Sequence, residues 1–152
     1  MGMILISCNP DKKRIVDRNE PVFKSNDASR LFFKNVRMLY YRIEKQNEGK
    51  IEVLRLKSRV EDSTKAIINV NIINNWFQDK AYPMIALSSY FDSLETIQIK
   101  MSSENGFSEV ISFEKNSGMD RHYYFASAIY EGILKNYEFE LLNSGEKIFT
   151  DG

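Results

Sequence analysis

The stretch from residue 94 to residue 115, LETIQIKMSSENGFSEVISFEK, decides the fold class of this chain. Two runs of alternating apolar residues, 94–101 and 107–115, flank a polar linker that ends in Gly106. Alternation at period two places one set of side chains on one face of a strand, and a short linker containing glycine is typical of a hairpin. The stretch therefore predicts two antiparallel strands, whose inward faces are Ile97, Ile99 and Met101 on the first and Phe107, Ile111 and Phe113 on the second.

The spacing of apolar residues changes after this hairpin. Over residues 120–135 they recur at i, i+3, i+4 and i+7, which predicts a helix with Ser117 or Asp120 as its N-cap. The predicted stripe consists of Phe125, Ala126, Ile129, Tyr130, Ile133 and Leu134. A glycine inside a helix costs about 1 kcal/mol relative to alanine. We therefore expect Gly132 where the helix approaches a sheet closely, and a final hairpin over residues 137–150.

A basic hairpin is predicted upstream, with arms Arg30–Gln46 and Lys50–Arg59. The Phe-Phe and Tyr-Tyr pairs of the first arm favour a strand, but a helix also fits the spacing of Phe32, Val36, Leu39, Tyr40 and Ile43. In the second arm Leu54 and Leu56 share one face. The opposite face is basic and carries Arg55, Lys57 and Arg59.

Two more strands are predicted between these hairpins. Residues 65–75 alternate, with Ala66, Ile68, Val70 and Ile72 inward and Asn69 and Asn71 outward. Residues 81–88 form the next strand, and Pro83 near its start indicates a sheet edge. About seven antiparallel strands and one helix in the C-terminal half, packed on the sheet, predict a single α+β domain over residues 28–152.

Composition fits one ordinary globular domain. The 152 residues are 43% hydrophobic and 28% charged, and no apolar run approaches the roughly 20 residues that span a bilayer. One Cys and one His exclude an internal disulfide and a zinc site of several Cys or His ligands. Residues 1–59 carry 14 Lys and Arg against 7 Asp and Glu, and residues 60–152 carry the reverse. Such asymmetry either marks a contact surface or cancels when the halves pack.

The N-terminal sequence Leu5-Ile6-Ser7-Cys8 resembles the lipobox of bacterial lipoproteins. The resemblance implies cleavage before Cys8, lipid attachment to its sulfur, and a place in the bacterial cell envelope as an outer-membrane lipoprotein facing the periplasm or the surface. Residues 1–7 would then be the remnant of a signal peptide and residues 8–27 a flexible tether. The basic start and the long apolar segment of a signal peptide do not precede the motif. The alternative is a short buried strand with Cys8 as a small core residue.

Catalytic signals are weak. The single histidine, His122, lies beside the apolar stripe of the predicted helix, where a packing role is the expectation. Glu138 and Glu140 alternate along a strand and share a face, which fits either an acid–base pair for sugar hydrolysis or a solvated face. Glycine-rich phosphate loops and calcium-binding loops are absent from the sequence. We expect no enzyme, metal or cofactor, and leave a carboxylate hydrolase open.

The segment NWFQDKAY, residues 75–82, is the most site-like stretch. It brings together the only tryptophan, an acid, a base and a tyrosine, a mixture typical of recognition surfaces. The candidates for partner contact are Trp76, Asp79, Lys80 and Tyr82. The alternative is a hairpin connection whose tryptophan plugs the end of the sheet.

Two functions from different classes follow. The first is a lipid-anchored, non-enzymatic envelope domain that binds a protein or glycan partner or serves a complex as an accessory. The second is an intracellular binding protein that uses the basic hairpin, residues 30–59, on nucleic acid or an acidic partner. The hairpin also suits anionic lipid headgroups, where each basic residue contributes about 1 kcal/mol.

Overall fold

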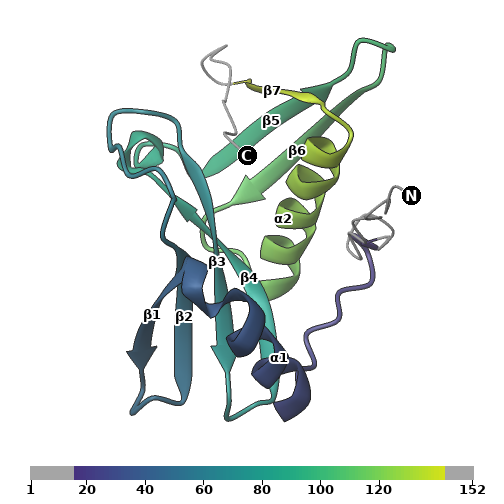
Figure 1. Ribbon diagram of the computed structural model, residues 1–152. Helices are drawn as coiled ribbons and strands as arrows, with labels where there is room; N and C mark the ends of the chain where they lie inside the picture. The colour runs from purple at the N-terminus through teal and green to yellow at the C-terminus, as the bar shows by residue number, and fades with distance from the viewer. Residues whose placement is uncertain (1–15, 143–152) are drawn as a thin grey trace, which may run out of the picture.

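The computed structural model describes residues 16–142, which form two antiparallel sheets and two α-helices (Figure 1). The α+β class, the predominance of β structure and the helix packed on the sheet are confirmed. The described strands number seven, but they divide into a four-stranded and a three-stranded sheet. Cys8, residues 1–7 and the last arm of the predicted C-terminal hairpin lie outside the described residues.

The first sheet has the strand order β1-β2-β3-β4. Its strands are β1 (Tyr41–Gln46), β2 (Ile51–Leu56), β3 (Ile68–Asn75) and β4 (Lys80–Leu87). Asn47, Glu48 and Gly49 all have positive φ and form the turn between β1 and β2, where the sequence predicts a hairpin loop. β4 ends the sheet, so the prediction that Pro83 lies on an edge strand is confirmed.

The second sheet holds the hairpin on which the fold prediction rested. β5 (Thr96–Ser102) lies between β6 (Ser108–Glu114) and β7 (Glu138–Leu141). The predicted inward residues of both arms are buried, with one exception: Phe107 precedes β6, is exposed, and stacks on Tyr137 with ring centroids 4.7 Å apart. The hairpin is confirmed, and the inward placement of Phe107 is wrong because the strand begins one residue later.

The helix α2 (Met119–Leu134) packs on the second sheet and against β4 (Figure 1). It begins at the N-cap Gly118, so neither Ser117 nor Asp120 caps it. A Cβ on Gly132 would lie 2.6 Å from the ring of Phe139, which confirms the predicted close approach to a sheet. The core here also includes Phe91 from the 3-10 helix η3 (Ser89–Phe91).

The predicted helical stripe is only half right. Phe125 and Ile129 are buried, but Tyr130, Ile133 and Leu134 are exposed. The buried face instead runs through the small residues Ala128 and Gly132. The helix lies so close to the sheet that small side chains line the contact, and larger apolar residues lie beside it.

The strand predicted from Arg30 to Gln46 is wrong before Tyr41. Residues Asp27–Arg37 form the helix α1, and Met38–Tyr40 form the 3-10 helix η2. A capping box starts α1, because the Asn26 side chain accepts from the Ser29 N–H at 2.8 Å and Ser29 Oγ accepts from the Asn26 N–H at 3.1 Å. This local bonding and the helical spacing outweigh the weak strand preference of paired aromatics.

The inward and outward faces predicted for β3 are also wrong at its centre. Asn71 is 1% exposed, whereas Val70 is exposed. β3 lies between β2 and β4, and buried residues occur on both of its faces, Asn71 and Ile73 on one and Asn74 on the other. A strand covered on both sides does not follow a rule that sends asparagine to solvent and valine to the core.

The segment before α1 lies along the edge of β4. Ser25 N–H donates to Asp79 O at 2.7 Å, and Ala81 N–H donates to Phe23 O at 2.8 Å. Farther upstream, Arg18 forms ion pairs with Glu109 of β6, at 2.7 Å, and with Glu131 of α2. Residues 8–27 were predicted to form a tether. From Arg18 onward this segment contacts the domain.

Candidate functional site

The helix α1 has an inverted orientation. Its most buried residue is Arg30, which is only 9% exposed, while Phe32 is 68% exposed. Leu31 and Val36 are exposed as well, and Lys34 lies partly buried with Arg30. Amphipathic helices of soluble domains normally place their apolar stripe toward the core. In α1 most of the apolar side chains face solvent, and Phe33 is the apolar residue that the helix turns inward.

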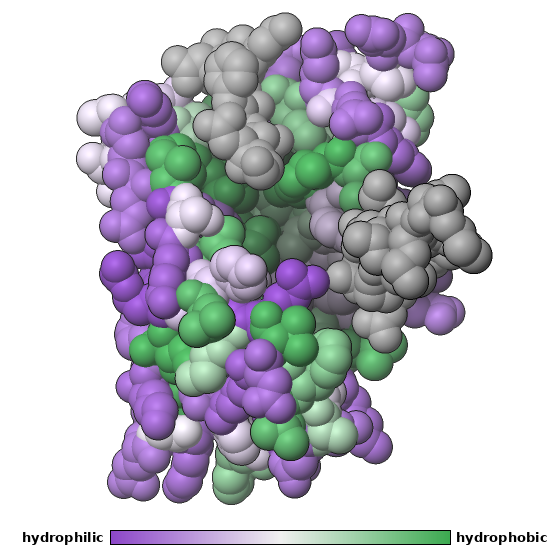
Figure 2. Space-filling model, viewed as in Figure 1, coloured by the Kyte–Doolittle hydropathy of each residue, from purple (hydrophilic) through white to green (hydrophobic). Residues whose placement is uncertain are grey.

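This stripe continues beyond the helix. Leu39 in η2 is 82% exposed, and the neighbouring Tyr40 is exposed as well. We name the combined surface the α1 face: Leu31, Phe32, Val36, Leu39 and Tyr40. In Figure 2 hydrophobic residues lie among hydrophilic ones over the part of the molecule where α1 and η2 lie. Contiguous apolar surface of this kind marks contact with a protein, a membrane or a ligand.

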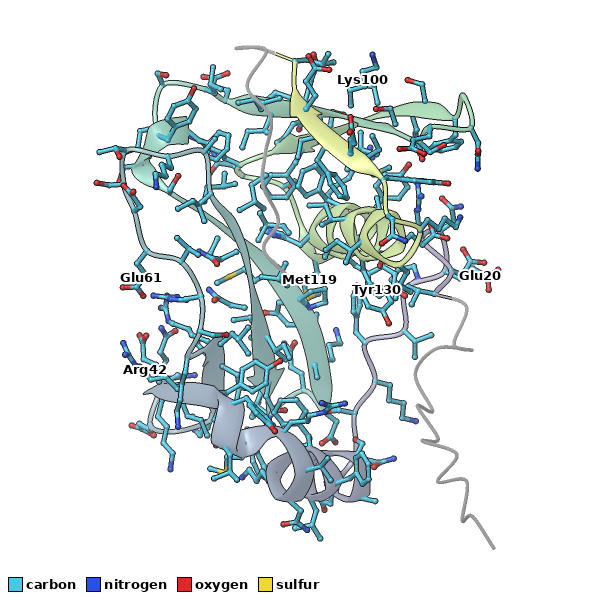
Figure 3. The ribbon with its side chains drawn as sticks, turned by 45° about the horizontal axis from the view of Figure 1, so that its top comes forward. Glu20, Arg42, Glu61, Lys100, Met119 and Tyr130 are labelled. Atoms are coloured by element: carbon cyan, nitrogen blue, oxygen red, sulfur yellow. The ribbon has the colours of Figure 1, made fainter. Side chains whose placement is uncertain are left out.

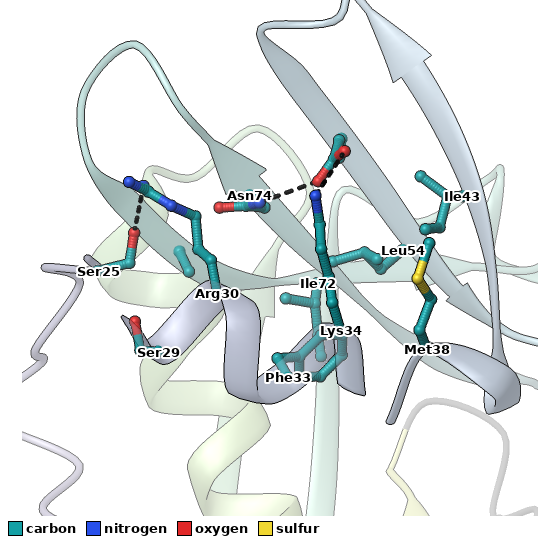
Figure 4. Close-up of a pocket in the computed structure, with 12 residues that line it drawn as sticks. Ser25, Ser29, Arg30, Phe33, Lys34, Met38, Ile43, Leu54, Ile72 and Asn74 are labelled. Carbon is teal, nitrogen blue, oxygen red and sulfur yellow. Dashed lines mark hydrogen bonds and ion pairs between the residues drawn. The ribbon is translucent and has the colours of Figure 1, made fainter. Parts of the chain in front are cut away.

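A cavity of about 190 Å³ lies between α1 and the first sheet (Figure 4). The helix contributes the side chains that it turns inward, Arg30, Phe33 and Lys34. Across from them, β2 and β3 contribute polar and apolar side chains in turn: Glu52, Leu54, Ile72 and Asn74. The inverted orientation of α1 therefore both exposes an apolar surface and encloses a partly polar cavity.

The four residues predicted to contact a partner do not lie together. Trp76 and Asp79 lie beside the cavity, and Lys80 and Tyr82 lie on β4. The Trp76 ring lies against Arg30 and Lys34, with Arg30 Cζ 4.8 Å and Lys34 Nζ 4.3 Å from the ring centroid. Asp79 Oδ1 accepts from Arg30 at 2.9 Å. Trp76 and Asp79 thus support the wall of the cavity.

The other two candidates lie on β4, beside the segment that precedes α1. Lys80 pairs through its backbone with Lys24. The Tyr82 ring meets that of Phe23 edge to face, with centroids 6.1 Å apart. The partner contact predicted for the four residues stays a prediction, and their geometry assigns them to two separate surfaces.

Of the predicted basic face, Arg55 lies on β2, while Lys57 and Arg59 follow the end of the strand at Leu56, and Arg55 and Arg59 are paired with acids. Arg55 donates to Glu44 at 2.9 Å, and Arg59 pairs with Glu61. Hydrogen bonds from Gln46 and Arg55 lower the pKa of Glu44, and a hydrogen bond from Arg59 lowers the pKa of Glu61. Figure 3 shows Glu61 and Arg42 on the same side of the domain. This pairing offers a phosphate backbone less uncompensated charge than the sequence suggested.

The catalytic candidates lie apart from the cavity. His122 is on α2, where Phe113 packs edge to face on its ring with centroids 4.9 Å apart. On β7, Glu138 is exposed and the half-buried Glu140 lies opposite Lys100 of β5. Within residues 16–142, no group of three or more His, Cys, Asp or Glu side chains could hold a metal ion. Neither helix of that range has the length and apolar content of a membrane-crossing segment.

Comparison with known protein families, curated proteins and solved structures finds no match for this chain. The functional argument therefore starts from the α1 face and the cavity beneath it.

Sequence reasoning did not single out the polar residues of the cavity, namely Arg30, Lys34, Glu52 and Asn74. Two signals were present. Arg30 and Lys34 are four residues apart, so they share one face if this stretch is helical, and the spacing of its apolar residues allowed a helix. Glu52 shares a strand face with Leu54 and Leu56, which places a carboxylate in line with core positions.

Proposed function

We propose that this chain is a non-enzymatic binding domain of the bacterial cell envelope, held by lipid on Cys8 and resting on the membrane through the α1 face. One observation supports the contact of the α1 face with the membrane: α1 turns Arg30 inward and exposes Phe32 and Val36. A soluble domain gains free energy by burying such side chains, at about 25 cal/mol per Å². A surface that leaves them outside is suited to an apolar environment.

The charge around the α1 face favours a bilayer as that environment. Residues 27–59 carry nine Lys and Arg against four Asp and Glu, and of these bases Arg55 and Arg59 are already paired with Glu44 and Glu61. Helices that lie in the membrane interface combine an apolar stripe with basic residues that meet anionic headgroups. The α1 face has the aliphatic and aromatic residues of such a stripe, and the exposed Arg37 in the last turn comes from the same helix.

The Cys8 anchor and the α1 face support one another energetically. The lipid that a lipobox cysteine receives is a diacylglycerol, and its two acyl chains anchor stably where a single chain gives only marginal membrane binding. Such an anchor holds the α1 face close to the bilayer. A face that already lies on the bilayer also fixes the orientation of the domain. The anchor itself stays a prediction, because it rests on the likeness of Leu5-Ile6-Ser7-Cys8 to a lipobox.

Vesicle binding tests the membrane contact. We expect the full chain to sediment with vesicles rich in anionic phosphatidylglycerol and less with neutral phosphatidylcholine vesicles. Val36→Ser should weaken this binding several-fold, because it adds a hydroxyl to the α1 face. Val110→Ser on β6 is the matched control, since Val110 is 52% exposed and Val36 is 47% exposed. Equal binding by both variants and the parent chain would contradict the proposal.

Two further measurements separate the alternatives. If Val36→Ser converts a dimer to a monomer in light scattering and leaves vesicle binding unchanged, the α1 face binds a second copy instead. The anchor is tested apart from the face by the intact mass of the chain expressed in bacteria from its genomic reading frame. Acyl mass should be present on the parent chain and absent from Cys8→Ser.

A further inference from the structure

Two side chains that line the cavity beneath α1 each carry one fully buried polar atom without a hydrogen-bond partner, a donor on Arg30 and an acceptor on Asn74. Arg30 Nε and Asn74 Oδ1 have no hydrogen-bond partner, and both side chains are more than nine-tenths buried. The remaining polar atoms are bonded: Arg30 donates to Ser25 and Asp79, and Asn74 Nδ2 donates to Glu52 at 3.0 Å. Buried polar groups are rarely left unbonded, since each costs about 1–3 kcal/mol.

The two side chains lie on opposite walls of the cavity. Arg30 comes from α1 and Asn74 from β3, and Figure 4 shows the Asn74 amide between the Arg30 and Lys34 side chains. A group that both donates and accepts hydrogen bonds, such as a hydroxyl or an amide, matches this pair. The rest of the lining is mainly apolar and includes Phe33, Met38, Ile43, Leu54 and Ile72.

The charges of the cavity are compensated within the protein. Arg30 Nη2 lies 2.7 Å from Asp27 Oδ1 and 2.9 Å from Asp79 Oδ1. Lys34 Nζ lies 3.8 Å from Glu52 Oε1. A charged ligand would have to displace one of these partners or lose its own hydration without a counter-charge. The site therefore favours an uncharged ligand.

We infer that this cavity binds a small neutral amphipathic molecule, with a hydroxyl or amide group toward Arg30 and Asn74 and a hydrocarbon body against Phe33 and Leu54. A cavity of 150 Å³ accepts benzene, so the volume of 190 Å³ suits a ligand of roughly seven to ten non-hydrogen atoms. The site is distinct from the α1 face, which is the outer side of the same helix, and does not depend on membrane contact.

Trp76 makes binding measurable. It is the only tryptophan in the chain, and its ring contacts Arg30 and Lys34, both of which line the cavity. A ligand that engages Arg30 changes the surroundings of the ring, so tryptophan emission reports on occupancy. Hexan-1-ol, hexanoate and hexane are suitable probes, because they share a six-carbon chain and differ in the presence and charge of the polar group.

We expect hexan-1-ol to change the emission of Trp76 saturably and to raise the melting temperature of the full chain. Hexanoate should bind at least tenfold more weakly than hexan-1-ol because of its charge. Hexane should also bind more weakly, because it leaves Arg30 Nε and Asn74 Oδ1 without a hydrogen-bond partner. Asn74→Leu should weaken hexan-1-ol binding about tenfold. The matched control is Asn71→Leu, the same substitution on the opposite face of β3, which should leave binding unchanged.

Ala81→Leu provides a second test in case Asn74→Leu does not fold. Ala81 also lines the cavity, and a larger side chain there fills its volume and should abolish hexan-1-ol binding. The inference is overturned if hexan-1-ol gives no saturable signal or if hexanoate binds as tightly. Equal losses in Asn71→Leu and Asn74→Leu would also overturn it, because they would show a general loss of structure.

Discussion

Nδ1 of His122 on α2 accepts a hydrogen bond of 2.9 Å from the backbone N–H of Ile85 in β4. β4 ends the first sheet, so this bond gives an edge backbone group a partner from the other half of the domain. The expectation that His122 has a packing role agrees with this geometry. The bond requires Nδ1 to be unprotonated, which links the contact between the two halves to pH.

Stability should therefore fall as the pH drops through the range in which histidine titrates. Burial lowers the pKa of His122 below its ordinary value of 6.5, and a hydrogen bond to the Ser117 backbone opposes this effect. The unfolded chain takes up the proton first, so the free energy of unfolding decreases below pH 6.5 until the folded pKa is reached. Urea unfolding at pH 7.5 and 5.5 measures this decrease.

His122→Asn is the control for that experiment, because asparagine keeps an acceptor and does not titrate. The chain has no other histidine. The difference between the parent chain and the variant therefore isolates the effect of His122 from that of the carboxylates. An identical pH dependence in both would contradict the role assigned to this bond.

Gly132→Ala should destabilise the fold by about 1–3 kcal/mol, the usual range for overpacking a core. The added Cβ would lie 2.6 Å from Phe139 and 3.3 Å from the sulfur of Met101. The free-energy cost of this clash exceeds the gain of about 1 kcal/mol that alanine gives over glycine through its higher helix propensity. Thermal or urea unfolding measures the change.

Phe139→Leu should relieve that clash, since it shortens the side chain that Gly132 meets. In a double-mutant cycle, Gly132→Ala should then cost less in the Phe139→Leu background than in the parent chain. Equal costs in both backgrounds would show that the ring is not what requires glycine here.

Asn71→Leu should stabilise the protein by about 1–3 kcal/mol. Both polar atoms of the Asn71 amide are buried without a hydrogen-bond partner, and leucine has a similar shape without polar atoms to desolvate. Asn74→Leu is the contrast, because it removes a hydrogen bond to Glu52 and should destabilise the fold. A loss of stability in Asn71→Leu would indicate that its amide has a partner in solution.

Asn26→Ala should reduce stability by about 1 kcal/mol, the usual value of an N-cap. The Asn26 side chain bonds the backbone N–H of Ser29 at the start of α1. Asn26→Ser keeps a capping oxygen and should be close to neutral. Urea unfolding followed by circular dichroism compares the two variants. If both behave alike, the capping box does not determine where α1 starts.

The β5–β6 hairpin could be predicted from the sequence because period and burial agree there, whereas in α2 the period located the helix but predicted only half of its buried face. Ile97, Ile99 and Met101 alternate and face one core, so a period of two was a reliable guide. Gly132 was placed correctly for the same reason, since a glycine in a clear helical pattern requires a packing explanation.

The α1 region could not be predicted because its pattern is inverted. Apolar side chains of a soluble domain are normally buried, whereas Phe32 is exposed and Arg30 is buried. The spacing allowed a helix, but its polar side is the one that faces the sheet. Of the candidate site, Trp76 and Asp79 were identified as site-like, but their partner Arg30 was not, because contacts across 49 residues are not visible in a single sequence.

Arg18 ties the N-terminal segment to two elements of the domain at once. It forms ion pairs with Glu109 on β6 and Glu131 on α2, upstream of the segment that runs along β4 into α1. A pull on the N-terminal end therefore strains these ion pairs first, and α1 carries no tension until they break. High ionic strength weakens such pairs, so the force needed to pull Arg18 from β6 and α2 should fall as salt is added, while the backbone hydrogen bonds at Phe23 and Ser25 still hold the segment next to α1.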